Sequence, residues 1–142
     1  MTLRRILTCT FALALALPLF AEEKKSPVTA GQWEVTIQVE MPGLPVTVPP
    51  VKSSYCLTDE DVADPKKSVP TGAGMNARCQ IKDMKVSGST ISYKVDCPDD
   101  KIKGEAEMTY KPASFEGTMK MKIEDQDQEF TTKYTGKRLG DC

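Results

Sequence analysis

The sequence contains no histidine. This absence excludes Ser-His and Cys-His nucleophile pairs, histidine metal ligands and the commonest acid–base group of enzymes. Paired carboxylates or a lysine base would remain, but the acidic residues mostly fall in turns or at positions predicted to face water, where their usual role is solubility. We therefore expect a protein that is not an enzyme and has no cofactor, with a carboxylate hydrolase as a competing interpretation.

Beyond its first residues the chain has no long apolar run, and it has no block of like charges. Arg4 and Arg5 precede an apolar run at residues 6–17, which suits a signal peptide and is too short to span a bilayer comfortably. We predict a signal peptide at residues 1–21, cleaved near Ala21, and one exported, periplasmic domain at residues 22–142. A retained N-terminal anchor is the alternative.

The charge balance gives little support for a polyanionic partner. The chain has 19 basic and 20 acidic residues, and Arg4 and Arg5 leave with the signal, so the mature net charge is −3. We expect binding neither to nucleic acid nor to an anionic membrane surface. The mature chain has no predicted transmembrane segment, and we expect a monomer.

Four cysteines remain after the signal is removed: Cys56, Cys79, Cys97 and Cys142. An even number in an oxidising compartment predicts two disulfides, with a zinc site as the competing interpretation, disfavoured because no Cys-x-x-Cys pair is present. A predicted hairpin over residues 79–97 favours Cys79–Cys97, which leaves Cys56–Cys142 by elimination. Cys56–Cys79 is the main alternative, and Cys56–Cys97 with Cys79–Cys142 is the third connectivity.

Apolar and polar residues alternate along most of the mature chain. Trp33, Val35, Ile37 and Val39 form one side of a first strand, and residues 51–57 predict a second. The hairpin over 79–97 needs a bulge near Asp83 to bring its apolar residues onto one face, with a three-residue loop at 87–89.

The longest alternating stretch, residues 102–136, predicts three consecutive paired strands. A turn at residues 112–113 places Tyr110 opposite Phe115 and Met108 opposite Gly117. A second turn centred on residues 126–127 places Ile123 opposite Phe130. Large residues then face small ones, and all three strands share one apolar face.

These patterns predict an all-β fold: an antiparallel meander of about six to eight strands that forms a curved sheet or a partly open barrel. One short helix is expected in the insert at residues 58–68, where Thr58 can cap the N-terminus. The acidic residues Asp59, Glu60 and Asp61 also raise the possibility of calcium, although their spacing does not match an EF-hand loop.

The segment from Met41 to Pro50 has four prolines and is otherwise apolar. Proline excludes an interior strand, so the segment is either a connection or edge over one end of the core, or a contact surface for a partner or ligand. The candidate contact residues are Met41, Leu44, Val46 and Val48. Lys137 and Arg138 are a second candidate, for an anionic group, unless they only form a turn that leads to Cys142.

The methionines allow a further interpretation. Met84, Met108, Met119 and Met121 could lie together, and thioethers bind Cu(I). Three of them fall on the alternating apolar face, where methionine commonly fills gaps in a core. Core packing is therefore the favoured interpretation, and no metal site is assigned.

Short motifs in fixed order run through nearly the whole mature chain. They are Gly31-Gln32-Trp33-Glu34, Met41-Pro42-Gly43, Pro49-Pro50, Cys56-Leu57-Thr58, Cys79, Gly88, Cys97, residues 104–110, residues 117–121 and residues 134–142. Together they resemble the domain of unknown function DUF3617, a group of small exported bacterial proteins. The resemblance implies a periplasmic or envelope location in a Gram-negative bacterium, and it brings no established activity or catalytic residue.

We expect a non-catalytic envelope module that binds a protein partner or an apolar ligand through one end of the sheet and the proline-rich segment. A lipocalin-like carrier of a lipid-type small molecule is the alternative. A cavity lined by methionine and aromatic residues would favour the carrier, whereas a filled core with an exposed edge would favour a protein partner.

Overall fold

The computed structural model describes residues 26–43, 48–70 and 79–142. The predicted signal peptide and the candidate residues Leu44 and Val46 lie outside these residues. The described elements, in chain order, are β1 (Gly31–Glu40), β2 (Val51–Leu57), α1 (Asp59–Ala63), α2 (Pro65–Ser68), β3 (Gln80–Ser87), β4 (Thr90–Cys97), η1 (Pro98–Asp100), β5 (Ile102–Lys111), β6 (Ser114–Ile123), η2 (Glu124–Gln126) and β7 (Gln128–Gly140).

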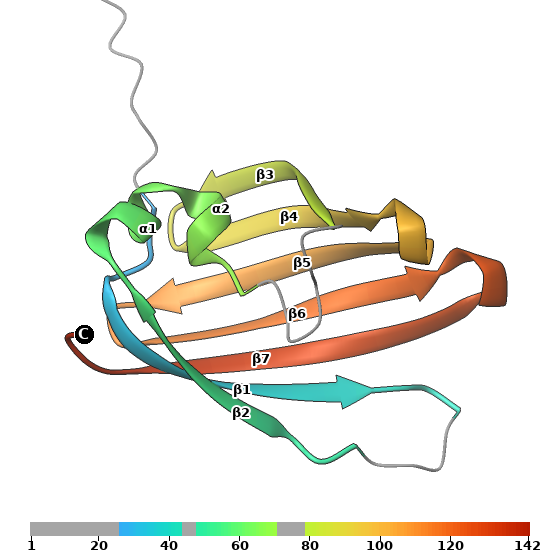
Figure 1. The fold of residues 1–142 in the computed structure, drawn as a ribbon, viewed down its shortest axis with the longest axis horizontal. Coiled ribbons are helices and arrows are strands. Elements are labelled where there is room, and N and C mark those ends of the chain that lie inside the picture. The colour runs from blue at the N-terminus through green and yellow to red at the C-terminus, as the bar shows by residue number, and fades with distance from the viewer. Residues whose placement is uncertain (1–25, 44–47, 71–78) are drawn as a thin grey trace, which may run out of the picture.

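The described strands form one curved antiparallel sheet in the order β2-β1-β7-β6-β5-β4-β3 (Figure 1). Strands β3 to β7 are a meander, and β7 then pairs with β1, which joins the two ends of the chain. The edges β2 and β3 do not pair with each other, so the sheet is open. The predicted all-β meander with a curved, open sheet is confirmed.

The predicted pairing of β5 with β6 is confirmed throughout. Tyr110 lies opposite Phe115 and Met108 lies opposite Gly117. Position 117 has room only for glycine, because a Cβ there would overlap the carbonyl oxygen of Glu107 and the sulfur of Met108. The large residues therefore occupy the space that the glycines leave.

The predicted register of β6 with β7 is wrong by two residues. Ile123 pairs with Gln128 rather than with Phe130, which pairs with Met121. The connection is formed by η2 and Asp127, whose φ of 49° is left-handed, so the turn is centred one position earlier than predicted. A shift of two residues preserves the faces, and the apolar face is the one expected.

The predicted bulge in the β3–β4 hairpin is confirmed. The register shifts between Lys82 and Lys85, and Asp83 has a φ of 50°. Before the bulge Ile81 pairs with Val95, as predicted. The predicted three-residue loop is wrong, because Ser87 pairs with Thr90 and leaves only Gly88 and Ser89 in the turn.

The insert contains two short helices rather than the one predicted. Thr58 caps α1 in a capping box with Asp61. Asp64 ends α1 and also caps α2, whose first residue, Pro65, has no N–H to satisfy. The two helices lie over the end of the sheet where β2 ends and β4 begins (Figure 1).

The core lies on the inner face of the sheet, which is the face that carries the buried apolar side chains. Met108, Met119 and Ile91 are completely buried, and Trp33 is 1% exposed. The Phe115 ring packs between Trp33 and Tyr110, with ring centroids 5.7 and 5.2 Å away. Val69, which follows α2, closes the core at the helix-bearing end. The described inner face is thus filled at this end.

All four tyrosines of the chain face the core. Tyr93 donates a hydrogen bond to the Pro70 carbonyl oxygen at 2.9 Å, and the Tyr110 hydroxyl is buried without a partner among the described residues. Burial raises the pKa of Tyr55 to about 12 and raises the pKa values of Tyr93, Tyr110 and Tyr134 as well. Each phenol is therefore held in its neutral form by the fold.

We expect stability to fall steeply in alkali. Above the ordinary phenol pKa of about 10 the unfolded chain releases protons that the folded chain keeps, so each buried tyrosine lowers the free energy of unfolding by about 1.4 kcal/mol per pH unit. Urea denaturation at stepped pH, with phenolate absorbance followed in parallel, measures this. The Tyr93→Phe variant should have a shallower slope. Phenolate forming near pH 10 in a still-folded protein would contradict the prediction.

Candidate binding edge

Strand β2 is an outer edge of the sheet, and its only described strand neighbour is β1. Val51, Ser53 and Tyr55 pair with inner-face residues of β1, whereas Lys52 and Ser54 pair with outer-face residues. Residues 51–54 are all exposed, and Val51, a large apolar residue, is 52% exposed. An edge strand presents unpaired N–H and C=O groups, which another strand can bind.

The other edge, β3, is protected in ways that β2 is not. Its bulge at Asp83 interrupts the ladder, and Lys82 pairs with Asp96 at 2.6 Å while Lys94 pairs with Asp83 at 3.2 Å. Bulges and edge lysines are the usual devices that prevent edge-to-edge association. Strand β2 has an unbroken register with β1 and one lysine, Lys52, which pairs with Glu34 at 3.4 Å. The two edges are therefore unequal.

Apolar residues lie beside the start of β2. Met41, just after β1, is 36% exposed, and Val48 is half-buried two residues before Pro50. On the inner face at this end of the sheet, Ile123 and Phe130 are half-buried. Of the contact residues predicted in the proline-rich segment, Val48 thus lies just before β2, and Met41 lies just after β1, four positions beyond the residue that pairs with Val51.

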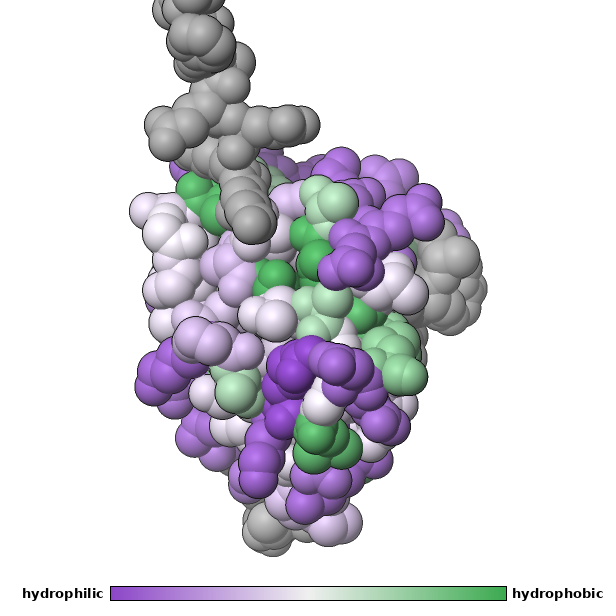
Figure 2. Space-filling model, turned by 90° about the vertical axis from the view of Figure 1, so that its left-hand side faces the viewer, coloured by the Kyte–Doolittle hydropathy of each residue, from purple (hydrophilic) through white to green (hydrophobic). Residues whose placement is uncertain are grey.

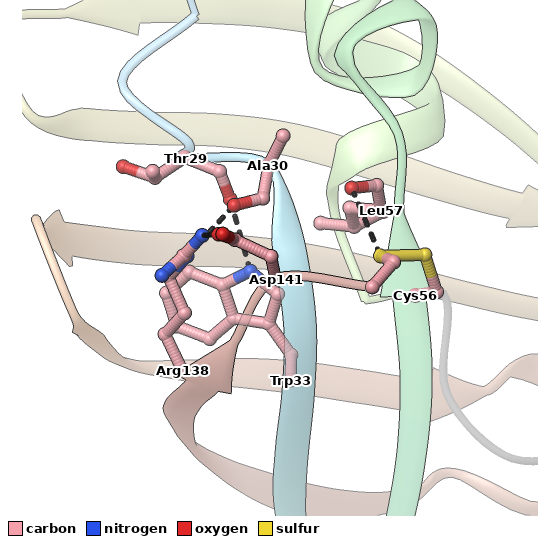
Figure 3. Close-up of polar contacts among 8 residues, drawn as sticks. Thr29, Ala30, Trp33, Cys56, Leu57, Arg138 and Asp141 are labelled. Atoms are coloured by element: carbon pink, nitrogen blue, oxygen red, sulfur yellow. Dashed lines mark hydrogen bonds and ion pairs between the residues drawn. A yellow bond between two sulfur atoms is a disulfide. The ribbon is translucent and has the colours of Figure 1, made fainter.

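The second predicted contact pair lies at the opposite end of the sheet. The Arg138 guanidinium donates to the Ala30 carbonyl oxygen at 2.7 Å and pairs with Asp141 (Figure 3). Trp33 donates from its indole nitrogen to the Thr29 carbonyl oxygen at 2.9 Å. Through these contacts Arg138 holds the segment that precedes β1 against the end of β7, and we call this arrangement the clasp. Its neighbour Lys137 is exposed and pairs in register with Glu34.

The surface around this clasp does not form one continuous apolar area. Figure 2 looks onto the helix-bearing end and shows, among its coloured atoms, hydrophobic surface in separate small areas bordered by hydrophilic residues. A pocket here is lined by residues of both charges, Arg138 with Asp59 and Asp141. The guanidinium already has its partners, so the arrangement favours a structural role for Arg138.

The cysteines pair as preferred from the sequence. Cys56 and Cys142 are joined across 86 residues with a Cα–Cα distance of 5.8 Å, and Cys79 and Cys97 across 18 residues with a Cα–Cα distance of 4.2 Å. The first disulfide attaches the last residue of the chain to β2. With all four thiols oxidised, a four-cysteine zinc site is excluded.

The side chains considered as metal ligands either pack in the core or cap a helix. Met108 and Met119 are completely buried, and Met84 and Met121 are half-buried. In the acidic insert, a hydrogen bond from Thr58 lowers the pKa of Asp61, whose carboxylate completes the capping box. Among the described residues, no three of histidine, cysteine, aspartate and glutamate are grouped as a metal site would need.

A groove of about 680 Å³ crosses the outer face over strands β3 to β7, and apolar as well as charged residues line it. One wall carries Lys94, Glu105 and Lys120, which are neighbours across the strands, and the other includes Asp96 and Lys103. Positive and negative groups alternate along these walls. Lys103 also pairs with Glu124 at 2.6 Å, which raises its pKa. This alternation is typical of a solvated sheet face.

The residues that the structure describes form an open, seven-stranded antiparallel sheet with two disulfides. The chain belongs to DUF3617, a protein family of unknown function, whose model matches residues 28–142. No curated protein and no solved structure matches the chain. In the described part of the chain, no helix has the length and apolar character needed to cross a membrane.

Val51 and the β2 edge were not predicted from the sequence as a candidate site. Residues 51–57 were predicted as a strand. Whether that strand is an edge depends on the pairing of β7 with β1, which is a contact between distant parts of the chain. One local signal was present. Pro49 and Pro50 directly precede a strand with two consecutive serines, a composition that suits an edge better than a buried position.

Proposed function

We propose that this protein is a non-catalytic periplasmic module that binds a protein partner by accepting an extended strand at the β2 edge. The single observation that carries the proposal is the exposure of β2 residues 51–54 beside an unbroken register with β1. The predicted signal peptide and the two disulfides favour the oxidising periplasm.

Strand addition suits the chemistry of this edge. The partner's main chain would bond to the free N–H and C=O groups of β2, and its alternate side chains would fall on the inner face beside Val51 and Tyr55. Val48 adds apolar surface just before the strand. Apolar side chains at alternate positions of the partner would therefore bind best.

The packing of the described core favours a protein partner over a carrier of an enclosed ligand. Met108 and Met119 are completely buried, and the space above Gly136 is occupied by the Phe115 ring. A small-molecule site of the carrier type needs an apolar hollow several hundred Å³ in size. A groove of about 680 Å³ lies instead on the outer face of the sheet, where most of the residues that line it are charged.

Site-specific photocrosslinking in the periplasm tests the proposal. A photoreactive residue in place of Ser53 on β2 should give a defined crosslinked band whose mass spectrum contains peptides of one partner protein. The same residue in place of Lys85 on the protected edge β3 is the matched control and should give no such band.

The crosslink must also depend on the apolar edge. Val51→Asp should reduce it about tenfold, because a carboxylate would replace an apolar contact. Leu139→Asp should leave it unchanged, because Leu139 is 53% exposed on β7 at the other end of the sheet from Val51. Equal crosslinking from positions 53 and 85, or none from position 53, would mean that β2 is not the binding edge.

A further inference from the structure

We propose that the strand accepted by β2 is β2 of a second copy of this chain, so that two sheets join into one continuous antiparallel sheet. This inference rests on the proposed function, because it names the partner of the same edge. It departs from the monomer expected from the sequence. The arrangement is isologous, with a two-fold axis that passes through the centre of the paired strands.

The pattern of β2 is complementary to itself in one register. When Ser53 faces Ser53 of the second copy, Val51 faces Tyr55 of that copy on the inner face and Lys52 faces its Ser54 on the outer face. Val51 is 52% exposed and Tyr55 is half-buried, so both have apolar surface left to bury. The two concave faces then lie on the same side of the joined sheet.

Moving the two-fold axis by one residue in either direction gives a less favourable pairing of the two β2 strands. With the axis at Lys52, two lysines would face each other, and like charges directly opposite are destabilising. With the axis at Ser54, Val51 would face Leu57 of the second copy, which is 6% exposed and leads directly into the helical insert. In the preferred register, the ladder ends where Pro50, which has no N–H, faces Cys56.

The contact between the two copies is small, so we expect the affinity of the dimer to be low. Five residues of each copy pair, and the apolar contribution comes from two Val51–Tyr55 pairs. Interfaces of this size are at the weak end of specific association. We therefore expect a dimer that dissociates on dilution, with a dissociation constant in the micromolar range.

Two measurements on the purified mature protein test the dimer. Light scattering coupled to gel filtration over a dilution series should show the molar mass falling from two copies to one. Val51→Lys should weaken the dimer about tenfold or more, since it puts a charge against Tyr55, while Leu139→Lys should leave it unchanged.

A cysteine trap tests the register. Ser53→Cys should form an intermolecular disulfide on oxidation, because position 53 faces itself across the axis. Ser54→Cys should not, because positions 54 of the two copies would be about 7–8 Å apart, beyond the usual reach of a disulfide. Peptide mapping must confirm that Cys56–Cys142 and Cys79–Cys97 stay intact.

A single-copy mass at every concentration would overturn the inference, as would trapping at position 54 that equals trapping at position 53. The proposed function fails differently. If the protein is a monomer and the photocrosslinker at position 53 still captures another protein, the second copy is wrong and strand addition at β2 stands. If neither occurs, both are wrong.

Discussion

Replacing Cys56 and Cys142 by alanine is expected to lower the free energy of unfolding by about 4–5 kcal/mol. The disulfide joins residues 86 positions apart, so its removal frees a loop that contains most of the strands of the described sheet. The entropy of closing such a loop accounts for the size of the effect in the chain-entropy model. Urea denaturation of oxidised wild type and of the double variant measures the difference.

The reason for this large effect lies in the topology. Strands β1 and β2 are joined to the rest of the sheet only through the pairing of β1 with β7, so the ends of the chain must be brought together. Cys142 follows β7 directly and Cys56 lies in β2, so the disulfide spans the three strands that make this closure. Without it, we expect the β1–β2 hairpin to open first.

Urea denaturation of both proteins in reducing agent is the control. In reducing agent both proteins lack the disulfide, so their free energies of unfolding should agree to within the small effect of the two alanines. A gap under oxidising conditions of less than about 1.5 kcal/mol would show that the disulfide contributes little to closure.

A methyl group at Gly117 is expected to cost about 3 kcal/mol, which is large for a Gly→Ala change. The added Cβ would overlap the Glu107 carbonyl oxygen and the Met108 sulfur, and Met108 is completely buried. Because the carbonyl belongs to the neighbouring strand β5, the strands themselves must move apart. Overpacking of this kind usually costs about 1–3 kcal/mol.

Gly104→Ala is the matched comparison, since both glycines lie on the inner face in the β5–β6 pair. A Cβ at Gly104 would lie 3.0 Å from the Lys120 carbonyl oxygen and 3.0 Å from the Met121 Cγ atom. The half-buried Met121 side chain can move aside, and the carbonyl oxygen needs to shift by only a few tenths of an ångström, whereas the contacts at Gly117 are much shorter. We expect a cost of about 1 kcal/mol or less. Equal losses at the two positions in urea denaturation would contradict the packing described for Gly117.

The sequence predicted the local features of the fold well, for physical reasons that particular elements illustrate. The β5–β6 register follows from two signals that agree, the Pro112 turn and the opposition of large and small residues. The bulge at Asp83 was needed to place the apolar residues of β3 on one face. Period-two alternation determines faces strongly, so these predictions held.

The predictions that failed concern turns, where alternation carries no information. A shift of two residues between β6 and β7 leaves every side chain on its face, so the pattern could not distinguish Gln128 from Phe130 opposite Ile123. The left-handed Asp127 is what fixes that turn. Similarly, Asp64 both ends α1 and begins α2, which the pattern of the insert did not show.

The candidate site could be predicted only in part. Met41 was identified by its apolar context beside proline, and it is exposed just after β1. The edge itself could not be predicted, because β2 is an edge only as a result of β7 pairing with β1. The charge of Arg138 suggested a binding role, but its hydrogen bond to Ala30 is a contact between the two ends of the chain, which spacing alone does not reveal.

Hydrogen exchange at β2 tests the central claim most directly. The amides of residues 51–57 should exchange faster in the free, dilute protein than in the crosslinked complex, while the amides of β3, residues 80–87, should exchange equally in both. Exchange followed by mass spectrometry on the two peptides makes the comparison within one sample. Protection that appears on β3 or on the outer face, with β2 unchanged, would contradict strand addition at β2.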